Sequence, residues 1–265
     1  MKKILVLGLV FMMVFAMVPV MAEGDASLEY ILNNGKLILG FDASFPPMGF
    51  VDEDGAYVGY DLDLAKEVCA RLGVELVLQP IDWTAKELEL NAKNIDCIWN
   101  GMTASAERAA SMCLSAPYLE NSQVLCVKED SAVKTLADLA GKVVSVQAAS
   151  SGSDAVNAAA DFKASLKEVS EFSDYAVALM DLDNGSCDAV AIDIIVAEYY
   201  IAKKGASYRI LEESLSPEQY AIGFRKADEA LCQKINDTLL EMANDGALEK
   251  ITTEWFGNNI SIIGK

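Results

Sequence analysis

The sequence predicts an α/β protein built from two successive sets of strands and helices. Between residues 36 and 99, short apolar runs alternate with amphipathic segments whose apolar residues recur every three or four positions. A second alternation of this kind extends from residue 122 to residue 211. Apolar residues make up 52% of the chain and charged residues 23%, as in packed globular proteins. Strands that alternate with helices indicate a parallel sheet, and the second set indicates a separate core.

The N-terminal residues 1–22 have the pattern of a secretory signal peptide. Lys2 and Lys3 precede an apolar run at 4–18, which is too short to read as a membrane span. Small residues then form a cleavage site that ends at Ala22. We therefore expect cleavage near Ala22 and a mature protein that is periplasmic or secreted.

The first set begins with an apolar strand at residues 36–41. The loop at 42–48 follows, and its two prolines exclude a helix there. An amphipathic helix begins at Asp61 and ends at Gly73, because glycine is typical of the position just after a helix. The next strand is expected at 74–78.

A capping pattern opens the following helix, which we expect to end near Lys93. Thr84 is followed three residues later by Glu87, as in a capping box. An apolar strand at 95–99 comes next and ends in Asn100-Gly101. The order strand, helix, strand, helix, strand completes the first set.

The elements of the second set and of the C-terminal part are predicted from the same kinds of pattern. In chain order the segments are an extended segment at 122–127, a short helix from Thr135 to Gly141, a strand at 143–146, a helix from about Ser153, a helix at 175–182, and strands at 188–192 and 208–211. After them come an extended segment at 220–225 and helices at 228–244 and 246–256.

Charge and composition exclude several classes of function. The formal net charge of −19 repels phosphate backbones, so we expect no nucleic-acid partner. Histidine is absent, which removes the commonest general base and the commonest metal ligand. We therefore predict no catalytic residue, no metal site, no cofactor and no enzyme activity.

The six cysteines show no C-x-x-C pair and no zinc spacing. We interpret them as small buried hydrophobic residues. Exported proteins often oxidise their cysteines, which leaves one disulfide, Cys113 with Cys126, open.

Three small polar segments lie where predicted strands end. They are Asn100–Thr103, Ala149–Gly152 and Asp193. In open α/β sheets, ligands bind at the carboxyl ends of strands. The first two segments also precede helix starts, whose free N–H groups attract anions. Arg108 follows the first segment, so a cation and an anion, Arg108 and Asp193, together suit a zwitterion.

Several segments, taken in order, carry a family resemblance. The sequence Gly-Tyr-Asp-Leu-Asp-Leu-Ala-Lys-Glu at 59–67 resembles a signature of that family. The other matching segments are Ile81–Trp83, Asn100–Arg108, Ser115–Tyr118, Val146–Gly152, Asp188–Asp193, Asp245–Ile251 and Trp255–Gly257. Behind a signal peptide, this series resembles the extracytoplasmic solute-binding proteins of polar amino-acid ABC importers, solute-binding protein family 3.

The resemblance implies a two-lobe type II periplasmic-binding-protein-like fold. Mixed sheets would be flanked by helices, and two crossover strands would serve as the hinge. Lobe 1 would take residues 23–120 plus 218–265, and lobe 2 would take residues 121–217. Such proteins close on their ligand by hinge motion.

The resemblance also assigns the residues that would bind the backbone of an amino acid. The α-carboxylate would lie on Arg108, with Thr103 and the N–H groups near Gly101 and Ser151. Asp193 and a carbonyl or side chain around Asn100 and Gly101 would take the α-ammonium. Asn100 and Ala149 stand where serine and glycine are frequent in the family.

The ligand's side chain would meet a different group of residues. Phe45 and Trp83 would sandwich it, and Asp42 would face its far end. A carboxylate and aromatic walls suit a cation or a planar amide, so a free L-amino acid with a basic or amide side chain is favoured, and cystine stays open.

The resemblance implies delivery of the ligand to the membrane permease of an ABC importer by a monomeric protein. Two alternatives share the fold: a periplasmic dehydratase of aromatic amino-acid biosynthesis, and a sensor module or surface antigen. A sensor would continue into a transmembrane span, and we expect none after Trp255–Phe256.

Overall fold

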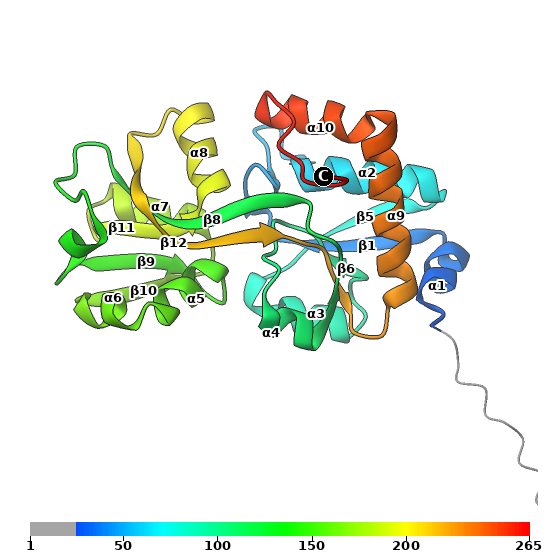
Figure 1. The fold of residues 1–265 in the computed structure, drawn as a ribbon, viewed down its shortest axis with the longest axis horizontal. Coiled ribbons are helices and arrows are strands. Elements are labelled where there is room, and N and C mark those ends of the chain that lie inside the picture. Colours follow the sequence, from blue (N-terminus) through cyan, green and yellow to red (C-terminus); the bar gives the residue numbers. More distant parts are fainter. Residues whose placement is uncertain (1–24) are drawn as a thin grey trace, which may run out of the picture.

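A computed structural model describes residues 25–265, whose strands form two five-stranded sheets and one small three-stranded sheet (Figure 1). The first sheet has the order β5 (Glu75–Pro80), β1 (Lys36–Phe41), β6 (Cys97–Ile98), β13 (Gly223–Arg225) and β7 (Met112–Leu114). The second has the order β10 (Glu168–Phe172), β9 (Val143–Gln147), β11 (Ala189–Asp193), β8 (Leu119–Lys128) and β12 (Tyr208–Tyr220). The small sheet contains β2 (Ser44–Phe45), β3 (Gly49–Val51) and β4 (Tyr57–Val58).

Both large sheets are mixed, as predicted. In the first, β1 pairs parallel with β5 and β6, and β13 joins antiparallel. In the second, β9 pairs parallel with β10 and β11, whereas β8 runs antiparallel to β11 and β12. The predicted α/β class with mixed sheets is therefore confirmed. The predicted signal peptide at residues 1–22 lies outside the described residues.

Helices cover both faces of each large sheet (Figure 1). Around the first sheet these are α1 (Ser27–Asn34), α2 (Tyr60–Leu72), α3 (Lys86–Asn91), α4 (Ala106–Ser111), α9 (Glu229–Asp245) and α10 (Ala247–Phe256). Around the second they are α5 (Ser151–Ala158), α6 (Ala160–Ser165), α7 (Tyr175–Asp183) and α8 (Ile194–Lys203). The short 3₁₀ helices are η1 (Trp83–Ala85) and η2 (Leu136–Leu139). Within residues 25–265, no helix combines the length and the apolar character that crossing a membrane requires.

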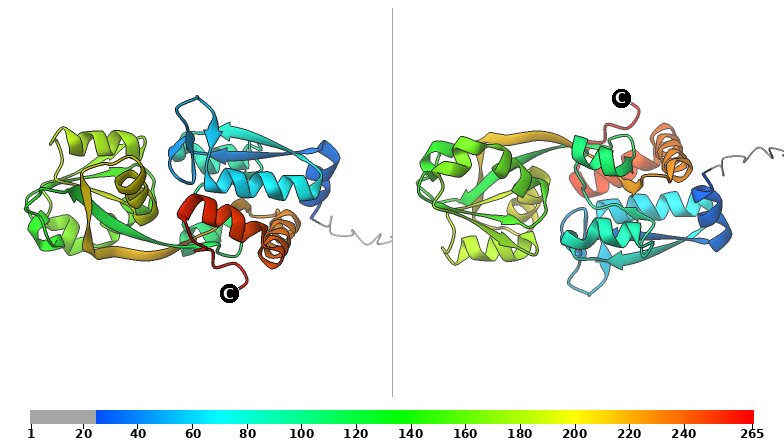
Figure 2. Two further views of the ribbon diagram at one scale, coloured as in Figure 1. Left: turned by 90° about the horizontal axis from the view of Figure 1, so that it is seen from above. Right: turned by 90° about the horizontal axis from the view of Figure 1, so that it is seen from below.

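Two long strands, β8 and β12, run between the two groups of elements (Figure 2). They pair antiparallel from Leu119↔Tyr220 to Lys128↔Tyr208, and the register shifts between Ile210 and Ser216. The sequence predicts two separate segments here, at 208–211 and 220–225. The structure instead extends the first segment to Tyr220 as β12, because its polar middle part pairs with β8 through backbone bonds that need no apolar pattern, and the second segment begins only at Gly223, as β13.

Two helix starts also differ from the predictions. Asp82, and not Thr84, caps the turn before α3, because its Oδ1 accepts from Thr84 N at 2.8 Å. Helix α5 begins before Ser153, because Ser150 Oγ accepts from the backbone N–H of that residue at 3.1 Å. Helices α1 and α8 have no counterpart in the predictions.

The cysteines are all free thiols in the structure. Five are buried, which confirms the interpretation for them, and Cys113 is partly exposed. Cys113 lies on β7 of the first sheet and Cys126 on β8 of the second, so the pairing left open above is not formed. The thiol of Cys113 instead lies beside that of Cys232 on α9. Burial raises the pKa of Cys126 to about 12, which keeps this thiol unreactive.

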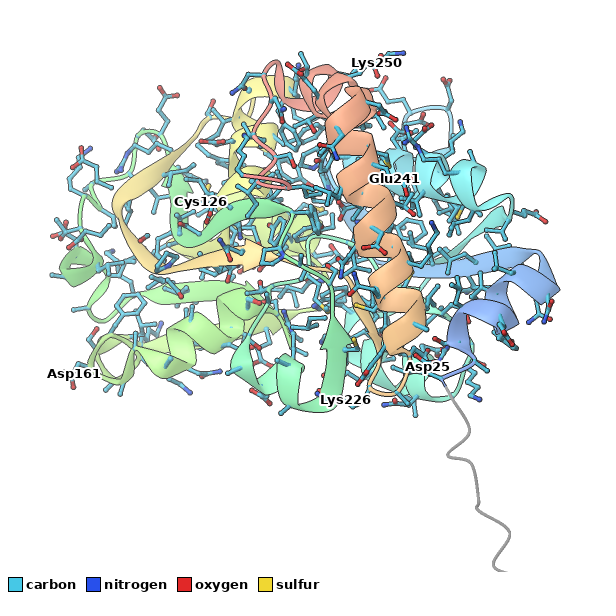
Figure 3. All side chains as sticks on the ribbon, turned by 45° about the vertical axis from the view of Figure 1, so that its right-hand side comes forward. Asp25, Cys126, Asp161, Lys226, Glu241 and Lys250 are labelled. Carbon is cyan, nitrogen blue, oxygen red and sulfur yellow. The ribbon has the colours of Figure 1, made fainter. Side chains whose placement is uncertain are left out.

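Side chains sort by polarity as expected for two packed cores. Figure 3 shows Cys126 inside the molecule, where it is fully buried, whereas Asp161, Lys226 and Lys250 lie on the outside and are exposed. Most of the largest buried side chains, Trp99 among them, lie around the first sheet, whereas Tyr175 lies on α7 beside the second sheet. The packed sheets hold the loops at their strand ends in fixed positions.

Candidate functional site

All nine residues singled out in the sequence line one small cavity between elements of the two sheets. Its lining consists of Asp42, Phe45, Trp83, Asn100, Gly101, Thr103, Arg108, Gln147, Ser150, Ser151, Tyr175 and Asp193. A larger surface groove lies between β8, α9 and the C-terminal residues and contains none of the polar loops. The charged and polar side chains selected from the sequence therefore lie in the smaller cavity.

Arg108 forms one end of this cavity. Its side chain projects from α4, which Ser105 caps, and the residue is only 6% exposed. Nη1 donates to the carbonyl of Thr103 at 2.9 Å and to Ser151 Oγ at 3.2 Å. Among residues 25–265, no carboxylate lies within 4.0 Å of the guanidinium. Burial lowers the pKa of Arg108, but guanidinium stays charged in proteins, so the buried charge suits an external carboxylate.

Thr103 and Ser151 complete this end. Ser151 Oγ donates to Thr103 Oγ1 at 2.7 Å, and Thr103 Oγ1 in turn donates to Glu218 Oε1 at 2.9 Å. Ser151 is the first residue of α5, where the leading N–H groups have no partner within the helix. These N–H groups and the Arg108 guanidinium together form a surface that attracts an anion.

Gly101 has a structural role in the loop. Its φ of +57° favours glycine, and a Cβ there would lie 2.7 Å from the Phe45 ring. Its N–H donates to Asp61 Oδ2 at 2.7 Å. The N–H of Gly101 itself is therefore occupied. The expectation that N–H groups near Gly101 face a ligand carboxylate therefore does not extend to the N–H of Gly101 itself.

Asp193 forms the opposite charge in the cavity. It ends β11 and precedes α8, yet its carboxylate makes no hydrogen bond that caps this helix. Oδ1 instead accepts from Asn121 Nδ2 and from the Tyr220 hydroxyl, both at 2.7 Å. The residue is 3% exposed, and no lysine or arginine of the described chain lies within 4.0 Å. Burial raises the pKa of Asp193, and a cation beside it would restore the charged form.

The side chain of Asn100, one of the groups expected to take the ammonium, is engaged within the protein. Its Oδ1 accepts from the backbone N–H of Asp42 at 3.0 Å, so this oxygen is occupied by the protein. Its Nδ2 is buried without a hydrogen-bond partner in the described chain. An amide nitrogen donates and cannot accept from an ammonium, so the side chain of Asn100 ties two loops together.

Asp42 and three aromatic rings form the remaining wall. Asp42 Oδ2 accepts from Gln147 Nε2 at 2.7 Å, and burial raises the pKa of Asp42 to about 6. The rings of Phe45 and Tyr175 lie 5.8 Å apart, and Trp83 is 7% exposed. A carboxylate beside aromatic faces is a favourable environment for an organic cation.

Lys86 is a functional candidate that the sequence analysis missed. It is 6% exposed, its ammonium lies 5.0 Å from the Trp83 ring, and Nζ donates to the carbonyl of Ala149 at 3.0 Å. Burial lowers the pKa of Lys86 to about 8. Ala149 has a φ of +54°, a region that favours glycine, which accounts for the frequent glycine at this position in the family.

Gln147 and Tyr175 also line the cavity and were not predicted to do so, and Ser150 lines it from within the predicted polar segment Ala149–Gly152. Tyr175 was recognised only as the start of a helix, and its hydroxyl donates to Ser150 Oγ at 3.3 Å. Gln147 follows the predicted strand at 143–146 and is the last residue of β9. Its place at the carboxyl end of a buried strand is a signal that could have identified it.

Comparison with known proteins gives a consistent set of relatives. The model of the bacterial extracellular solute-binding proteins, family 3, matches residues 37–258. The L-cystine-binding protein TcyJ of Escherichia coli K12 is 28% identical over 260 residues, 96% of each chain. The ABC transporter arginine-binding protein 1 of the same organism is 30% identical over 226 residues, 83% of this chain and 90% of that protein.

Two solved structures of similar proteins share the fold. An ABC uptake transporter substrate-binding protein from Streptococcus pneumoniae with bound histidine has a TM-score of 0.88 and 36% identity, covering 91% of this chain and 100% of that one. Tv2483 bound to L-arginine has a TM-score of 0.87 and 31% identity, covering 91% and 99%.

Proposed function

This chain belongs to the bacterial extracellular solute-binding proteins of family 3, and from that membership we propose that it binds one free polar L-amino acid and delivers it to the permease of an ABC importer. One observation carries the proposal. The buried guanidinium of Arg108 and the buried carboxylate of Asp193 line the same cavity, and neither has an ion-pair partner within the described chain. A zwitterion supplies both missing partners.

The backbone of the amino acid is held by charges at both ends. Its carboxylate accepts from the Arg108 guanidinium, assisted by the Ser151 hydroxyl and the leading N–H groups of α5. Its ammonium donates to Asp193. Recognition of these two groups accepts L-amino acids as a class and leaves selection to the side chain.

The side-chain end favours a basic amino acid over an amide. Asp42 offers a carboxylate, and Phe45, Trp83 and Tyr175 offer aromatic faces, a combination that stabilises a guanidinium or ammonium group. Relatives whose structures contain arginine or histidine support this preference.

Asp42→Asn is expected to lower affinity for L-arginine at least about tenfold more than affinity for L-glutamine, because the amide loses the charge that a cation requires. Isothermal titration at a pH above the pKa of Asp42 measures both constants. Asp54→Asn, at an exposed turn, is the matched control and should bind as the unchanged protein does. Equal losses for the two ligands would remove Asp42 from side-chain selection.

Three hydrogen bonds between elements of the two sheets would hold the two lobes in a closed arrangement. Arg108 reaches Ser151, Lys86 reaches Ala149, and Gln147 reaches Asp42. We propose lobes at 23–120 plus 218–265 and at 121–217, joined by β8 and β12 as hinge strands. Opening of this hinge breaks those bonds and admits the ligand. Cleavage near Ala22 would release the mature, monomeric protein outside the cytoplasmic membrane.

A further inference from the structure

A second buried carboxylate, that of Glu218 on β12, lies beside Asp193. Asn121 Nδ2 donates to Asp193 Oδ1 at 2.7 Å and to Glu218 Oε1 at 2.5 Å. Because both oxygens contact the same nitrogen, they lie no further apart than the sum of these distances, about 5.2 Å. Gln123 Nε2 also donates to Glu218 Oε1, at 2.9 Å. One network of amides therefore holds two carboxylates together.

No cation within the described chain neutralises this pair. Neither carboxylate has a lysine or arginine within 4.0 Å. The ionisable groups that face the pair are Arg108 from α4, Asp154 from α5, Tyr175 from α7 and Tyr220 from β12.

The two carboxylates resist being ionised together. Burial, and then the charge of Asp193, raise the pKa of Glu218 to about 7. Two neighbouring buried carboxylates keep one proton between them over a range of pH in which an isolated carboxylate would be ionised. The titration belongs to the pair, because the charge of one carboxylate acts on the other across the short distance that Asn121 sets.

We propose that Glu218 is a positioning residue for the ligand's α-ammonium, and that the Asp193–Glu218 pair holds one proton which the arriving ammonium displaces into the solvent. The proposal rests on the proposed function, because it needs an ammonium beside Asp193. The charge balances: the pair loses one proton and gains the positive charge of the ligand. Glu218 acts through Asn121, which orients Asp193. It also acts through Thr103, whose hydroxyl donates a hydrogen bond to Glu218.

The sign of the pH effect follows from this exchange. Below the pKa of the pair, binding must expel a proton, so affinity falls as the pH falls. Above it, no proton is expelled and affinity is constant. Glu218→Gln keeps an acceptor oxygen for Thr103 and Gln123 but cannot titrate, so Asp193 alone stays ionised to a lower pH.

The test is calorimetric titration with L-arginine between about pH 5.5 and 8, in buffers of different ionisation enthalpy, which counts the protons released. The ratio of the Kd of Glu218→Gln to that of the unchanged protein should fall about tenfold from the highest to the lowest pH. Proton release should fall in this variant and persist in Asp42→Asn, which removes a further carboxyl of the cavity lining whose pKa lies in this range. Glu212→Gln, exposed on the same strand, should release protons as the unchanged protein does.

A ratio of Kd values that is independent of pH would overturn the proposal, because a merely structural role of Glu218 shifts affinity equally at every pH. If Glu218→Gln fails to fold, the Asp42→Asn variant decides alone, and absence of proton release from it at about pH 6.5 overturns the proposal. Failure of the proposed function looks different, since no L-amino acid would then bind at any pH.

Discussion

Arg108→Ala is expected to abolish measurable amino-acid binding while the protein stays folded. Truncating one partner of a desolvated, hydrogen-bonded charge pair costs about 2–5 kcal/mol, which corresponds to a loss in affinity of about 30-fold to several thousandfold. The loss should lie near the upper limit, because the variant leaves the ligand carboxylate in a cavity whose other wall carries Asp193. Calorimetric titration of the ligand-free protein measures it.

The fold should tolerate this change. Arg108 makes hydrogen bonds to Thr103 and Ser151 but no ion pair with any carboxylate of the described chain, so removing it breaks no ion pair. Arg71→Ala on α2 is the matched control, since Arg71 pairs with Glu67 and Asp245 at the surface. Unchanged affinity in Arg108→Ala, or equal losses in both variants, would refute the assigned carboxylate site.

Asp193→Asn should give the second largest loss, again about 2–5 kcal/mol, because it removes the carboxylate that lines the cavity at the ammonium end but keeps the shape of the side chain. The amide can still accept from Asn121 and Tyr220 through its oxygen, so the loss reports charge. Titration with the same amino acid, alongside thermal unfolding, separates binding from stability.

The matched control for this variant is Asp188→Asn, just before the start of the same strand, where Asp188 pairs with a lysine near the surface. The control should bind as the unchanged protein does. A Kd for Asp193→Asn within about threefold of the control would mean that the ammonium lies elsewhere.

The part of the cavity lining that comes from polar loops at strand ends could be predicted from the sequence. Asn100–Thr103, Ala149–Gly152 and Asp193 all follow buried strands whose carboxyl ends converge, so their neighbourhood follows from the α/β order alone. The roles of single groups were less predictable. The occupied N–H of Gly101 and the occupied Oδ1 of Asn100 depend on Asp61 and on the backbone of Asp42, which come from other loops.

Glu218, Asn121 and Lys86 could not be found in this way. Glu218 and Asn121 lie on the two long crossing strands, whose facing residues are about a hundred positions apart and whose polar parts show no alternation. Lys86 occupies a helix start, where a lysine is ordinarily a solvated residue, and only tertiary packing places it on Trp83 and Ala149. Charged residues that become buried through long-range pairing carry no local sequence signal.

The most direct test of the central claim is calorimetric titration of the ligand-free mature protein with a panel of L-amino acids and with agmatine, which is arginine without its carboxylate. The account predicts one-to-one binding of a basic L-amino acid such as arginine, lysine, ornithine or histidine, weaker binding of glutamine and cystine, and no binding of agmatine. Absence of binding by every L-amino acid, or agmatine binding as tightly as arginine, would contradict it.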